Sequence, residues 1–480
     1  MDWKVDRASK KPIYKQIADF IEQGISTGEF SSESLLPSER ILAKELGVNR
    51  STIVTAYDEL QSHGIVERIK GSGTRISTDI WGVSHKRIPN WGRYVEDGSF
   101  LPNLPFVQQI QSESRKNNVI NLSSGELSPT LWPSEQFRSI FTDQPFLESL
   151  GYDHPKGNVS LRETISAHVS TYRHIDTSSS SILITSGAQQ ALHLIVQCLL
   201  KPGDAIAIEK PSYFYSLPLF QSAGLKIYHL PVNQHGVNPD DIVDLYKKHR
   251  IRMVFLNPDY QNPTGLTLHA ERRKKILDIS SEFGIPIVED DPYSLTSFEG
   301  KRISTLKSMD ANGTVLYISS LSKIVASGLR IGWIIGPSQV IDRVADAKQQ
   351  IDFGHSIFPQ WVANAFLKDP YFDVHISMLR QALKERCDEI VSCLKDFLPE
   401  EIECIPPEGG IHIWCKLKAK VDENQLLKEA MKRGVSFIPG SVYGTDKGYV
   451  RFTFGREEPQ RIREGISRFA EALKVCKQSK

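Results

Sequence analysis

The sequence predicts two domains of different fold class, a small α+β domain at the N-terminus and a large α/β domain after it. The first observation is length, because 480 residues exceed what one compact core usually holds. The second is a helical periodicity of apolar residues within the first 78 positions, which ends in a glycine-rich hairpin pattern. The third is an alternation of short apolar runs with helical stretches from about residue 116, typical of a largely parallel sheet.

The composition is that of an ordinary globular protein and argues against several classes. Hydrophobic residues make up 40% and charged residues 24%, and the sequence shows neither a signal-peptide pattern nor an apolar stretch of bilayer length. The six cysteines are scattered without a Cys-x-x-Cys pair, which predicts neither a disulfide framework nor a metal site. We therefore expect a cytoplasmic protein. The net charge of +1 does not itself indicate nucleic-acid binding, so that prediction depends on where basic residues lie.

The first domain shows the pattern of three helices joined by tight turns. Residues 12–27 carry apolar side chains at helical spacing. Ser38 is placed to cap a short second helix, after which Gly47 turns the chain. Asn49 is placed to cap a third helix, which ends at Gly64.

Two short extended runs, around residues 65–69 and 74–77, follow the third helix and are joined by a glycine-rich tip. This order describes a winged helix-turn-helix, whose third helix enters the major groove of DNA while other residues hold the phosphates. Basic residues that merely solvate a small helical domain are the alternative, and the ordered cap, turn, helix and wing argue against it. The predicted DNA contacts are Ser38, Arg40, Arg50, Ser51, Thr52, Lys70 and Gly73.

The first domain also resembles the GntR family of bacterial transcription regulators, over about residues 10–78. The resemblance rests on Leu36-Pro37-Ser38-Glu39-Arg40, on Asn49-Arg50-Ser51-Thr52 and on the wing Gly71-Ser72-Gly73-Thr74. It implies a domain that binds double-stranded operator DNA.

A linker is predicted between the two domains. Residues 79–115 lose the helical periodicity and carry Trp81, Trp91 and several prolines between polar stretches. Because this is not the composition of a flexible Gly/Ser linker, we expect a semi-rigid tether that docks in part against one domain. The expected limits are 1–78 for the first domain and 116–480 for the second, with subdomains at about 120–345 and 350–480.

Chemically unusual residues follow the predicted strands of the second domain, where parallel sheets bind ligands. Each of these loops alone could be an ordinary one, but four of them in this order indicate a site. A lysine and an arginine flanked by hydroxyl groups are suited to hold an aldehyde and a phosphate, respectively. The segments are Thr185-Ser186-Gly187-Ala188-Gln189 after 182–184, the loop with Asn262 after 253–256, Glu289-Asp290-Asp291-Pro292-Tyr293 after 285–288, and Ser320-Leu321-Ser322-Lys323 with Arg330 after 315–318.

This ordered set resembles the fold-type-I pyridoxal-phosphate enzymes, in particular class I aminotransferases, over about residues 115–480. The resemblance implies pyridoxal 5'-phosphate as cofactor and a transferase fold with large and small subdomains. Lys323 matches the lysine that forms the internal aldimine, and Asp290 matches the carboxylate paired with the pyridine nitrogen. Tyr293 and Asn262 match the residues that bond the ring oxygen. Lys323, Asp290 and Tyr293 are the predicted catalytic residues.

The resemblance also implies the remaining contacts. Tyr213 matches the aromatic residue that stacks on the cofactor ring. Tyr152 matches a tyrosine that reaches the phosphate of the neighbouring subunit, so the site is expected to need a homodimer. Arg451 matches the arginine that binds the substrate α-carboxylate, and Gly125 lies in a segment similar to the loop that closes over substrate. The expected phosphate contacts within the chain are Gly187, Ala188, Gln189, Ser320, Ser322 and Arg330.

A GntR-like head joined to an aminotransferase-like body resembles the MocR/GabR subfamily of bacterial regulators. The resemblance implies a head-to-tail homodimer without a membrane segment, associated with the nucleoid when it binds DNA. Three functions remain open: a regulator that senses an amino acid or amine through an external aldimine, an active aminotransferase with an accessory head, and a regulator that senses only the cofactor. The fused head argues against the second, and Arg451 argues against the third, so we expect the first.

Overall fold

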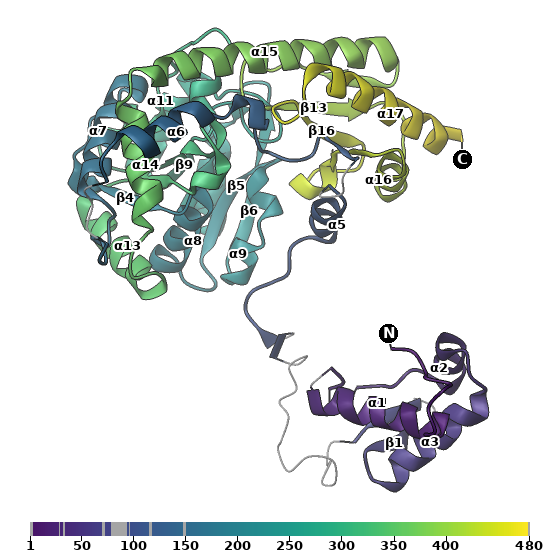
Figure 1. The fold of residues 1–480 in the computed structure, drawn as a ribbon. Coiled ribbons are helices and arrows are strands. Elements are labelled where there is room, and N and C mark those ends of the chain that lie inside the picture. The colour runs from purple at the N-terminus through teal and green to yellow at the C-terminus, as the bar shows by residue number, and fades with distance from the viewer. Residues whose placement is uncertain are drawn as a thin grey trace. The chain divides into compact units, whose positions relative to one another are not determined.

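The computed structural model describes residues 3–27, 29–31, 34–69, 73–77, 94–95, 97–114, 118–146 and 150–478. The chain divides into two compact units, Met1–Ser99 and Phe100–Lys480, each with its own hydrophobic core (Figure 1). The residues Lys70, Gly71, Ser72, Trp81 and Trp91, on which predictions were made, lie outside the described residues. Within the described segments, no helix has the length and apolar character needed to cross a membrane.

The first unit has the predicted winged helix-turn-helix fold. Its elements are α1 (Ile13–Thr27), α2 (Glu39–Leu46), α3 (Arg50–Ser62), β1 (Val66–Ile69) and β2 (Gly73–Ile76). The helices pack around an aliphatic core that includes Tyr57, whose hydroxyl donates to the Pro37 carbonyl at 2.8 Å. β1 and β2 pair antiparallel as the hairpin of the wing, with Val66 opposite Ile76.

Most helix ends in this unit follow the predicted capping residues. Ser38 Oγ accepts a hydrogen bond from the Ile41 amide at 3.4 Å, and Gly47 ends α2 with φ at +62°. Asn49 directly precedes α3, but its side chain makes no capping hydrogen bond to any described residue, so that part of the prediction is wrong. The Asn49 carbonyl accepts from the Thr52 amide at 3.0 Å, and the residue is exposed.

The second unit is built on an eight-stranded sheet in the order β4-β11-β10-β9-β8-β5-β6-β7. The pairs from β10 through β9, β8 and β5 to β6 are parallel, whereas β11 and β7 run antiparallel to their neighbours. This is the predicted, largely parallel sheet. Its strands are β4 (Ile182–Thr185), β5 (Ala205–Lys210), β6 (Lys226–Asn233), β7 (Gly236–Val237), β8 (Met253–Leu256), β9 (Ile287–Asp290), β10 (Val315–Ser320) and β11 (Gly332–Ile335).

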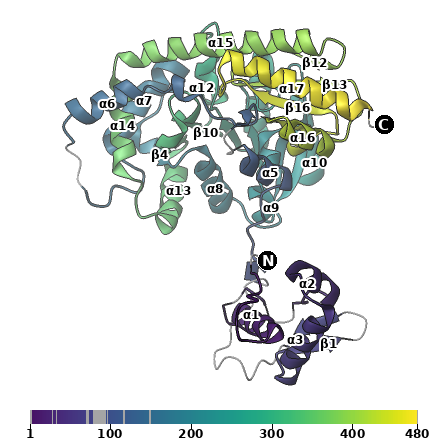
Figure 2. The ribbon, with the colours of Figure 1, turned by 45° about the vertical axis from the view of Figure 1, so that its right-hand side comes forward.

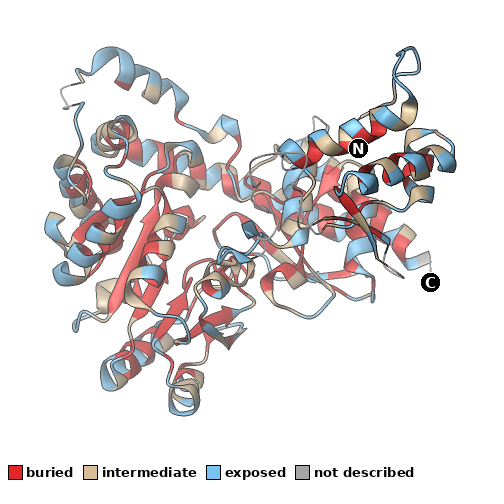
Figure 3. Ribbon diagram, turned by 90° about the horizontal axis from the view of Figure 1, so that it is seen from below, coloured by how far each residue is buried: buried red, intermediate tan, exposed pale blue. Residues whose placement is uncertain are grey.

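Helices cover the sheet on both faces (Figure 2). In β5, Ile206 and Ile208 pack with α8 and α13, whereas Ala205 and Ala207 pack with α10 and α11. Because successive strand residues point to opposite faces, burial on both faces produces the continuous apolar runs seen in the sequence (Figure 3). The helices are α6 (Ser134–Asp143), α7 (Val159–Arg173), α8 (Ala188–Leu199), α9 (Leu219–Ser222), α10 (Pro239–His249), α11 (Ala270–Phe283), α12 (Leu306–Met309), α13 (Ser338–Ile351), α14 (Ile357–Lys368) and α15 (Tyr371–Phe397).

A smaller layer follows α15. It holds the antiparallel sheet β12-β13-β16-β15, backed by α16 and by α17, which packs along α15 (Figure 1). The elements are β12 (Ile402–Cys404), β13 (His412–Leu417), α16 (Glu423–Lys432), β14 (Val435–Ser436), β15 (Ile438–Pro439), β16 (Tyr449–Thr453) and α17 (Pro459–Gln478). Short 3-10 helices of this unit are η1 (Pro129–Leu131), η2 (Ser179–Ser181), η3 (Tyr213–Ser216), η4 (Ser294–Thr296), η5 (Leu321–Lys323), η6 (Ser327–Leu329) and η7 (Gly440–Tyr443).

Three segments make contacts that the expected domain limits do not describe. β3 (Ile120–Asn121) pairs in parallel with β14, so the start of the expected large subdomain belongs to the smaller layer. α14, expected in the small subdomain, packs on α6 and α7. Residues 100–114 of the expected linker belong to the second unit, where α5 (Pro105–Glu113) buries Ile110. These contacts join segments far apart in the chain, and local sequence patterns do not reveal them.

Candidate functional site

The candidate site lies at the carboxyl ends of the central strands, where the sequence placed it. β9 and β10 each extend two residues beyond their predicted ends. Asp290 and Ser320 are therefore the last residues of strands rather than the first residues of loops. Ladder hydrogen bonding fixes the backbone of both residues, which makes their side chains better oriented than loop residues would be.

Lys323 lies in η5, directly after β10, and faces the loop that follows β3. Its Nζ donates to the carbonyl oxygen of Gly125 at 2.5 Å. Burial and the neighbouring Arg451 guanidinium lower the pKa of Lys323 to about 8. A substantial fraction of the amine is then neutral near pH 8, which is the form that attacks a carbonyl carbon. Predicted residues Gly125 and Lys323 thus meet across 198 positions of sequence.

Asp290 is buried, with 4% of its surface exposed. Its Oδ1 has no hydrogen-bond partner among the described residues. Burial and the adjacent Asp291 carboxylate raise the pKa of Asp290 to about 7, against the opposing charge of Lys323. A buried acceptor without a donor is costly unless a ligand supplies the donor. A protonated pyridine nitrogen supplies one, so this residue fits the cofactor that the sequence predicts.

Asn257 holds two predicted residues in place and was not itself predicted. Its Nδ2 donates to the Asp290 carbonyl at 2.8 Å, and its Oδ1 accepts from the Asn262 amide at 2.8 Å. Its own amide donates to the buried carboxyl of Glu209 at 2.9 Å. Burial raises the pKa of Glu209 to about 8. Both Asn257 and Asn262 precede a proline, and that repeat is the sequence signal that could have identified Asn257.

Arg451 lies on β16, so the smaller layer contributes its side chain to the site. Its guanidinium donates to Asn262 Oδ1 at 3.1 Å and to the carbonyl of Ser123, and it lies 5.3 Å from the ring centre of Tyr443. Its Nε has no partner in the described part of the chain. A buried guanidinium with an unused donor is suited to bind a carboxylate. The backbone amide of Tyr213 donates to the Asn262 carbonyl at 2.9 Å, so Tyr213 lies beside Asn262.

Tyr293 is buried, and its hydroxyl lies 3.1 Å from Nε2 of His412. His412 is the first residue of β13, and the sequence analysis did not single it out. It follows the Gly409-Gly410 pair, which is a turn signal and gives no indication of a site. His412 reaches the site because β13 pairs with β16, the strand that carries Arg451.

Gly187 and Arg330 form a cradle at the start of α8. Gly187 has φ at +94°, and a Cβ there would lie 2.9 Å from an Arg330 guanidinium nitrogen. Arg330 donates to the carbonyls of Ser186 at 2.6 Å and Ser327 at 3.2 Å. A helix N-terminus beside an arginine suits a phosphate, which is the ligand expected here from the sequence. Of the other predicted phosphate contacts, Ser320 is buried, Ser322 and Ala188 are half-buried, and Gln189 is exposed.

Tyr152 is not brought to this cluster within one chain. It is 87% exposed, and its ring lies against that of Phe353, which is 68% exposed, with 5.7 Å between the ring centres. Two large aromatic side chains left in solvent together are unusual for a surface with no partner.

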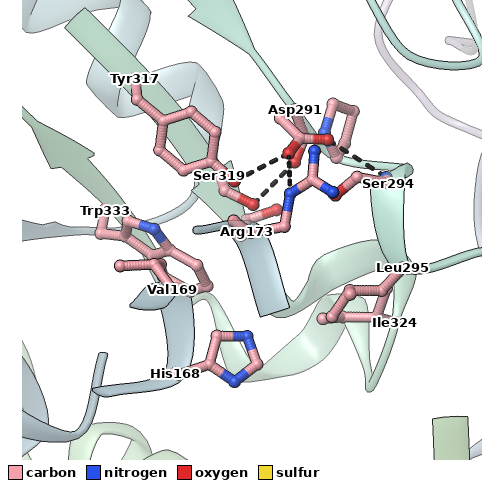
Figure 4. Close-up of a pocket in the computed structure, with 12 residues that line it drawn as sticks. His168, Val169, Arg173, Asp291, Ser294, Leu295, Tyr317, Ser319, Ile324 and Trp333 are labelled. Carbon is pink, nitrogen blue, oxygen red and sulfur yellow. Dashed lines mark hydrogen bonds and ion pairs between the residues drawn. The ribbon is translucent and has the colours of Figure 1, made fainter. Parts of the chain in front are cut away.

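A small cavity of about 10 Å³ lies beside Asp291, just after β9 (Figure 4). Asp291 anchors it by accepting from Arg173 at 3.1 Å and from the Tyr317 hydroxyl at 2.8 Å. His168 Nδ1 and Trp333 Nε1 line it, and neither has a partner among the residues described. Burial lowers the pKa of His168 to about 4. Protein groups thus satisfy both oxygens of the Asp291 carboxylate, whereas one oxygen of the neighbouring Asp290 has no partner among the described residues.

The predicted DNA contacts lie on the surface of the first unit. The side chains of Ser38, Arg40, Arg50 and Ser51 are exposed, as is Gly73, and Thr52 is half-buried. Arg50 donates to Glu39 at 2.9 Å, a solvent-exposed pair that can open at little cost when DNA binds. Among the described residues, no group of His, Cys, Asp and Glu side chains could hold a metal ion.

The chain is similar to known proteins over both units. Class I and II aminotransferases match residues 117–469, and the bacterial regulatory proteins of the gntR family match residues 13–76. An uncharacterised HTH-type transcriptional regulator, YdfD of Bacillus subtilis, is 38% identical over 96% of both chains. The HTH-type transcriptional regulator NorG of Staphylococcus aureus is 31% identical over 90% of this chain and 97% of its own.

The second unit is similar to enzymes. Aromatic-amino-acid aminotransferase 1 of Thermococcus litoralis is 32% identical over 80% of this chain and 95% of its own. The crystal structure of Pyrococcus horikoshii kynurenine aminotransferase has a TM-score of 0.73 and 32% identity, covering 78% of this chain and 95% of that one. The residues of the site fit pyridoxal phosphate, the cofactor that this aminotransferase fold implies. The chain therefore belongs to the GntR-type transcription regulators of the MocR/GabR kind, which join a DNA-binding head to a class I and II aminotransferase domain.

Proposed function

We propose that this regulator changes its binding to operator DNA in response to an amino acid or amine, which it senses through pyridoxal phosphate held at Lys323. One observation carries the proposal. A DNA-binding head is fused to a site in which a lysine of lowered pKa, the unpaired oxygen of Asp290 and the unused Nε of Arg451 lie together. A regulator that only bound the cofactor would have no use for a buried guanidinium with a spare donor.

Residues of this chain would hold each part of the cofactor. Asp290 Oδ1 would accept from the ring nitrogen, and Tyr213 would cover a ring face. The cradle of Gly187 and Arg330 would take the phosphate. When bound, the cofactor supplies an electrophilic aldehyde carbon and an electron-accepting ring. Lys323 would act as the nucleophile toward that carbon, and the carbonyl of Gly125 accepts a hydrogen bond from its amine.

An effector with an amino group competes with Lys323 for the same carbon, and a carboxylate on the effector would bind Arg451. This exchange would break the bond between Lys323 and that carbon and free the Lys323 amine. The effector can then alter DNA binding only to the extent that it binds one arrangement of the protein better than another. The coupling is reciprocal, so operator DNA must change the apparent affinity for the effector by the same factor.

We also propose that the working unit is a homodimer in which Tyr152 reaches the phosphate of the neighbouring subunit. The support is an exposed aromatic surface, because patches of this kind mark interaction sites. Ring contacts join Phe141 to Trp361, Phe146 to Phe358 and Tyr152 to Phe353. The large exposed apolar residues of this surface are Phe141, Leu150, Tyr152, Ile351, Phe353 and Phe358.

The test is the visible absorption of the protein with pyridoxal phosphate while a panel of amino acids and amines is added, with operator affinity measured in parallel. A spectral change that persists for one ligand and alters operator affinity supports the sensor. A change that decays, and returns on addition of a keto acid, identifies the second candidate, an active aminotransferase, which the 32% identity to such an enzyme favours. If no visible band forms after addition of the cofactor, the proposal is wrong. Lys323→Ala is the control that should abolish the band.

A further inference from the structure

His412 links Tyr293 to Thr453 in one buried chain of hydrogen-bonding groups. Its Nε2 lies 3.1 Å from the Tyr293 hydroxyl, and its Nδ1 lies 3.0 Å from Thr453 Oγ1. The β13–β16 register places Thr453 directly opposite His412. The three residues are 3% exposed or less. The imidazole stands edge-on to the Tyr293 ring, with an interplanar angle of 83°.

The imidazole of His412 is neutral, so only one of its nitrogens carries a hydrogen. Burial and two cations, Arg451 on β16 and Lys323 in η5, hold the pKa of His412 well below its usual range. The third titratable group that faces the ring is Tyr293. On the remaining side lies Gly125, where a Cβ would come 3.8 Å from His412 Cε1 and 3.3 Å from Lys323 Nζ. Both ring nitrogens therefore have the partners already named, and a carbon of the ring faces Gly125.

Two arrangements of hydrogens satisfy this chain. In the first, the Thr453 hydroxyl donates to Nδ1, and the Nε2 hydrogen is donated to the Tyr293 oxygen. In the second, the Tyr293 hydroxyl donates to Nε2, and the Nδ1 hydrogen is donated to Thr453. They differ in one consequence, which is whether the hydroxyl hydrogen of Tyr293 remains available to the cofactor site. Thr453 Oγ1 has no further hydrogen-bond partner within the described ranges, so nothing competes with the role it has in the first arrangement.

We propose that Thr453 and His412 are positioning residues that impose the first arrangement and thereby reserve the hydroxyl hydrogen of Tyr293 for the ring oxygen of the cofactor. The inference rests on the proposed function. The ring oxygen would carry negative charge and can accept from both Asn262 and Tyr293, and only the first arrangement lets the Tyr293 hydroxyl donate to it. The imidazole N–H also polarises the Tyr293 hydroxyl and makes it a stronger donor, since hydrogen bonds in a chain reinforce one another.

The consequence is a defined direction of change in the pH titration of the visible band. A strong donor to the ring oxygen withdraws negative charge from it and weakens its hold on the proton at the Lys323 nitrogen. The pKa of the visible band is therefore lowered in the wild-type protein. His412→Phe keeps an edge-on ring but removes the donor to Tyr293, so we expect this pKa to rise by about 0.3 unit or more. The second arrangement predicts the opposite sign, because removal of His412 would release the Tyr293 hydrogen toward the cofactor.

The experiment is a spectrophotometric pH titration of the cofactor-loaded full chain with a matched pair of variants at Thr453. Thr453→Val removes the hydroxyl at nearly constant volume, and we expect a rise in the pKa of the visible band. Thr453→Ser keeps the hydroxyl, and we expect the wild-type value. A fall in the pKa with His412→Phe or Thr453→Val, or equal values for Thr453→Val and Thr453→Ser, would overturn the inference.

The Tyr293→Phe background provides the second measurement. Because His412 is proposed to act only through the Tyr293 hydroxyl, the shift caused by His412→Phe should vanish when Tyr293 is already phenylalanine. A shift that persists would mean that His412 acts on the cofactor directly, and the inference would be wrong. A wild-type protein without a visible band contradicts the proposed function, whereas a normal band that is insensitive to His412→Phe contradicts only this inference.

Discussion

At the scale of single residues, two neighbouring carboxylates at the end of β9, Asp290 and Asp291, have opposite environments. Asp291 accepts from Arg173 and from the Tyr317 hydroxyl, so its charge is compensated inside the protein. Asp290 Oδ1 has no partner among the described residues. A buried group left unpaired lowers stability, and functional sites commonly keep such groups because a ligand completes them. The difference between the two residues is therefore a sign of a binding role for Asp290.

We expect Asp290→Asn to stabilise the cofactor-free protein while it abolishes tight cofactor binding. The folded pKa of Asp290, about 7, is raised above its ordinary value of 3.8, so the folded state binds more protons between these pH values. The stability associated with this group is present at low pH and is lost as the pH rises through 7. At pH 8 the variant should gain on the order of 1–3 kcal/mol in urea unfolding, and at pH 4 it should gain little.

The matched control is Asp291→Asn, which removes a saturated carboxylate and should destabilise the protein at both pH values. Equal effects of the two substitutions, or a gain for Asp290→Asn that does not depend on pH, would contradict the assignment. Cofactor affinity of Asp290→Asn should fall at least about tenfold, because an amide cannot hold the ring nitrogen in its protonated form.

The lowered pKa of Lys323 predicts how the rate of cofactor uptake depends on pH. With a pKa of about 8, the Lys323 amine is half neutral at that pH, whereas an ordinary lysine has a pKa of 10.5. The rate at which the protein takes up pyridoxal phosphate, followed by stopped-flow absorbance, should rise with pH to half its maximum near pH 8. Arg451→Met removes a cation that lowers this pKa and should move the profile to higher pH. A wild-type midpoint near 10.5 would show that burial does not act on the lysine as described.

At the scale of elements, the strand ends were predictable and the contacts between layers were not. Asp290 and Lys323 could be assigned because each follows an apolar strand run and belongs to a motif of local sequence. Asn257 and His412 could not be assigned in this way, because their roles depend on partners 33 and 119 positions away. The register of β13 against β16 decides what His412 contacts, and no periodicity in either strand encodes that register.

In the first unit, too, local sequence predicted the elements but not the side-chain contacts between them. The helix pattern, the glycine turn and the wing were all read correctly from local sequence. The side-chain cap expected of Asn49 is not made, although its backbone carbonyl accepts from the first turn of α3, and nothing in the structure explains the difference from Ser38. The pairing of Arg50 with Glu39 was likewise not visible, since it joins two helices across the turn.

The head helices allow two kinds of DNA contact to be separated. Arg50 begins α3 and should read a base edge, so Arg50→Ala should weaken operator binding by about 10- to 100-fold with a smaller effect on unrelated DNA. Arg40 on α2 should hold a phosphate, so Arg40→Ala should weaken binding to all sequences and reduce the salt slope by about 1. Binding assays over a range of salt concentrations measure both quantities. Lys275→Ala, on α11 of the other unit, is the control and should change neither.

At the scale of the whole molecule, each unit has its own hydrophobic core. The exposed aromatic surface of the second unit predicts that a neighbouring subunit contributes Tyr152 to the cofactor site. Tyr152 is 87% exposed and makes no contact with Lys323 or the Gly187 cradle of its own chain among the interactions described. If it serves the neighbouring subunit, Tyr152→Ala and Lys323→Ala should complement each other. A mixed dimer would contain one site that has both residues and one site that lacks both.

We therefore expect that Tyr152→Ala protein alone binds pyridoxal phosphate weakly and that Lys323→Ala protein alone gives no visible band. After the two are co-expressed and the mixed dimer is purified through two different tags, a visible band should form with wild-type affinity at half of the sites. If Tyr152 instead acted within its own chain, every Lys323 in the mixture would face a damaged site, and the affinity would stay weak. The complementation thus distinguishes a site shared between subunits from one that each chain builds alone, with the visible band as the measurement.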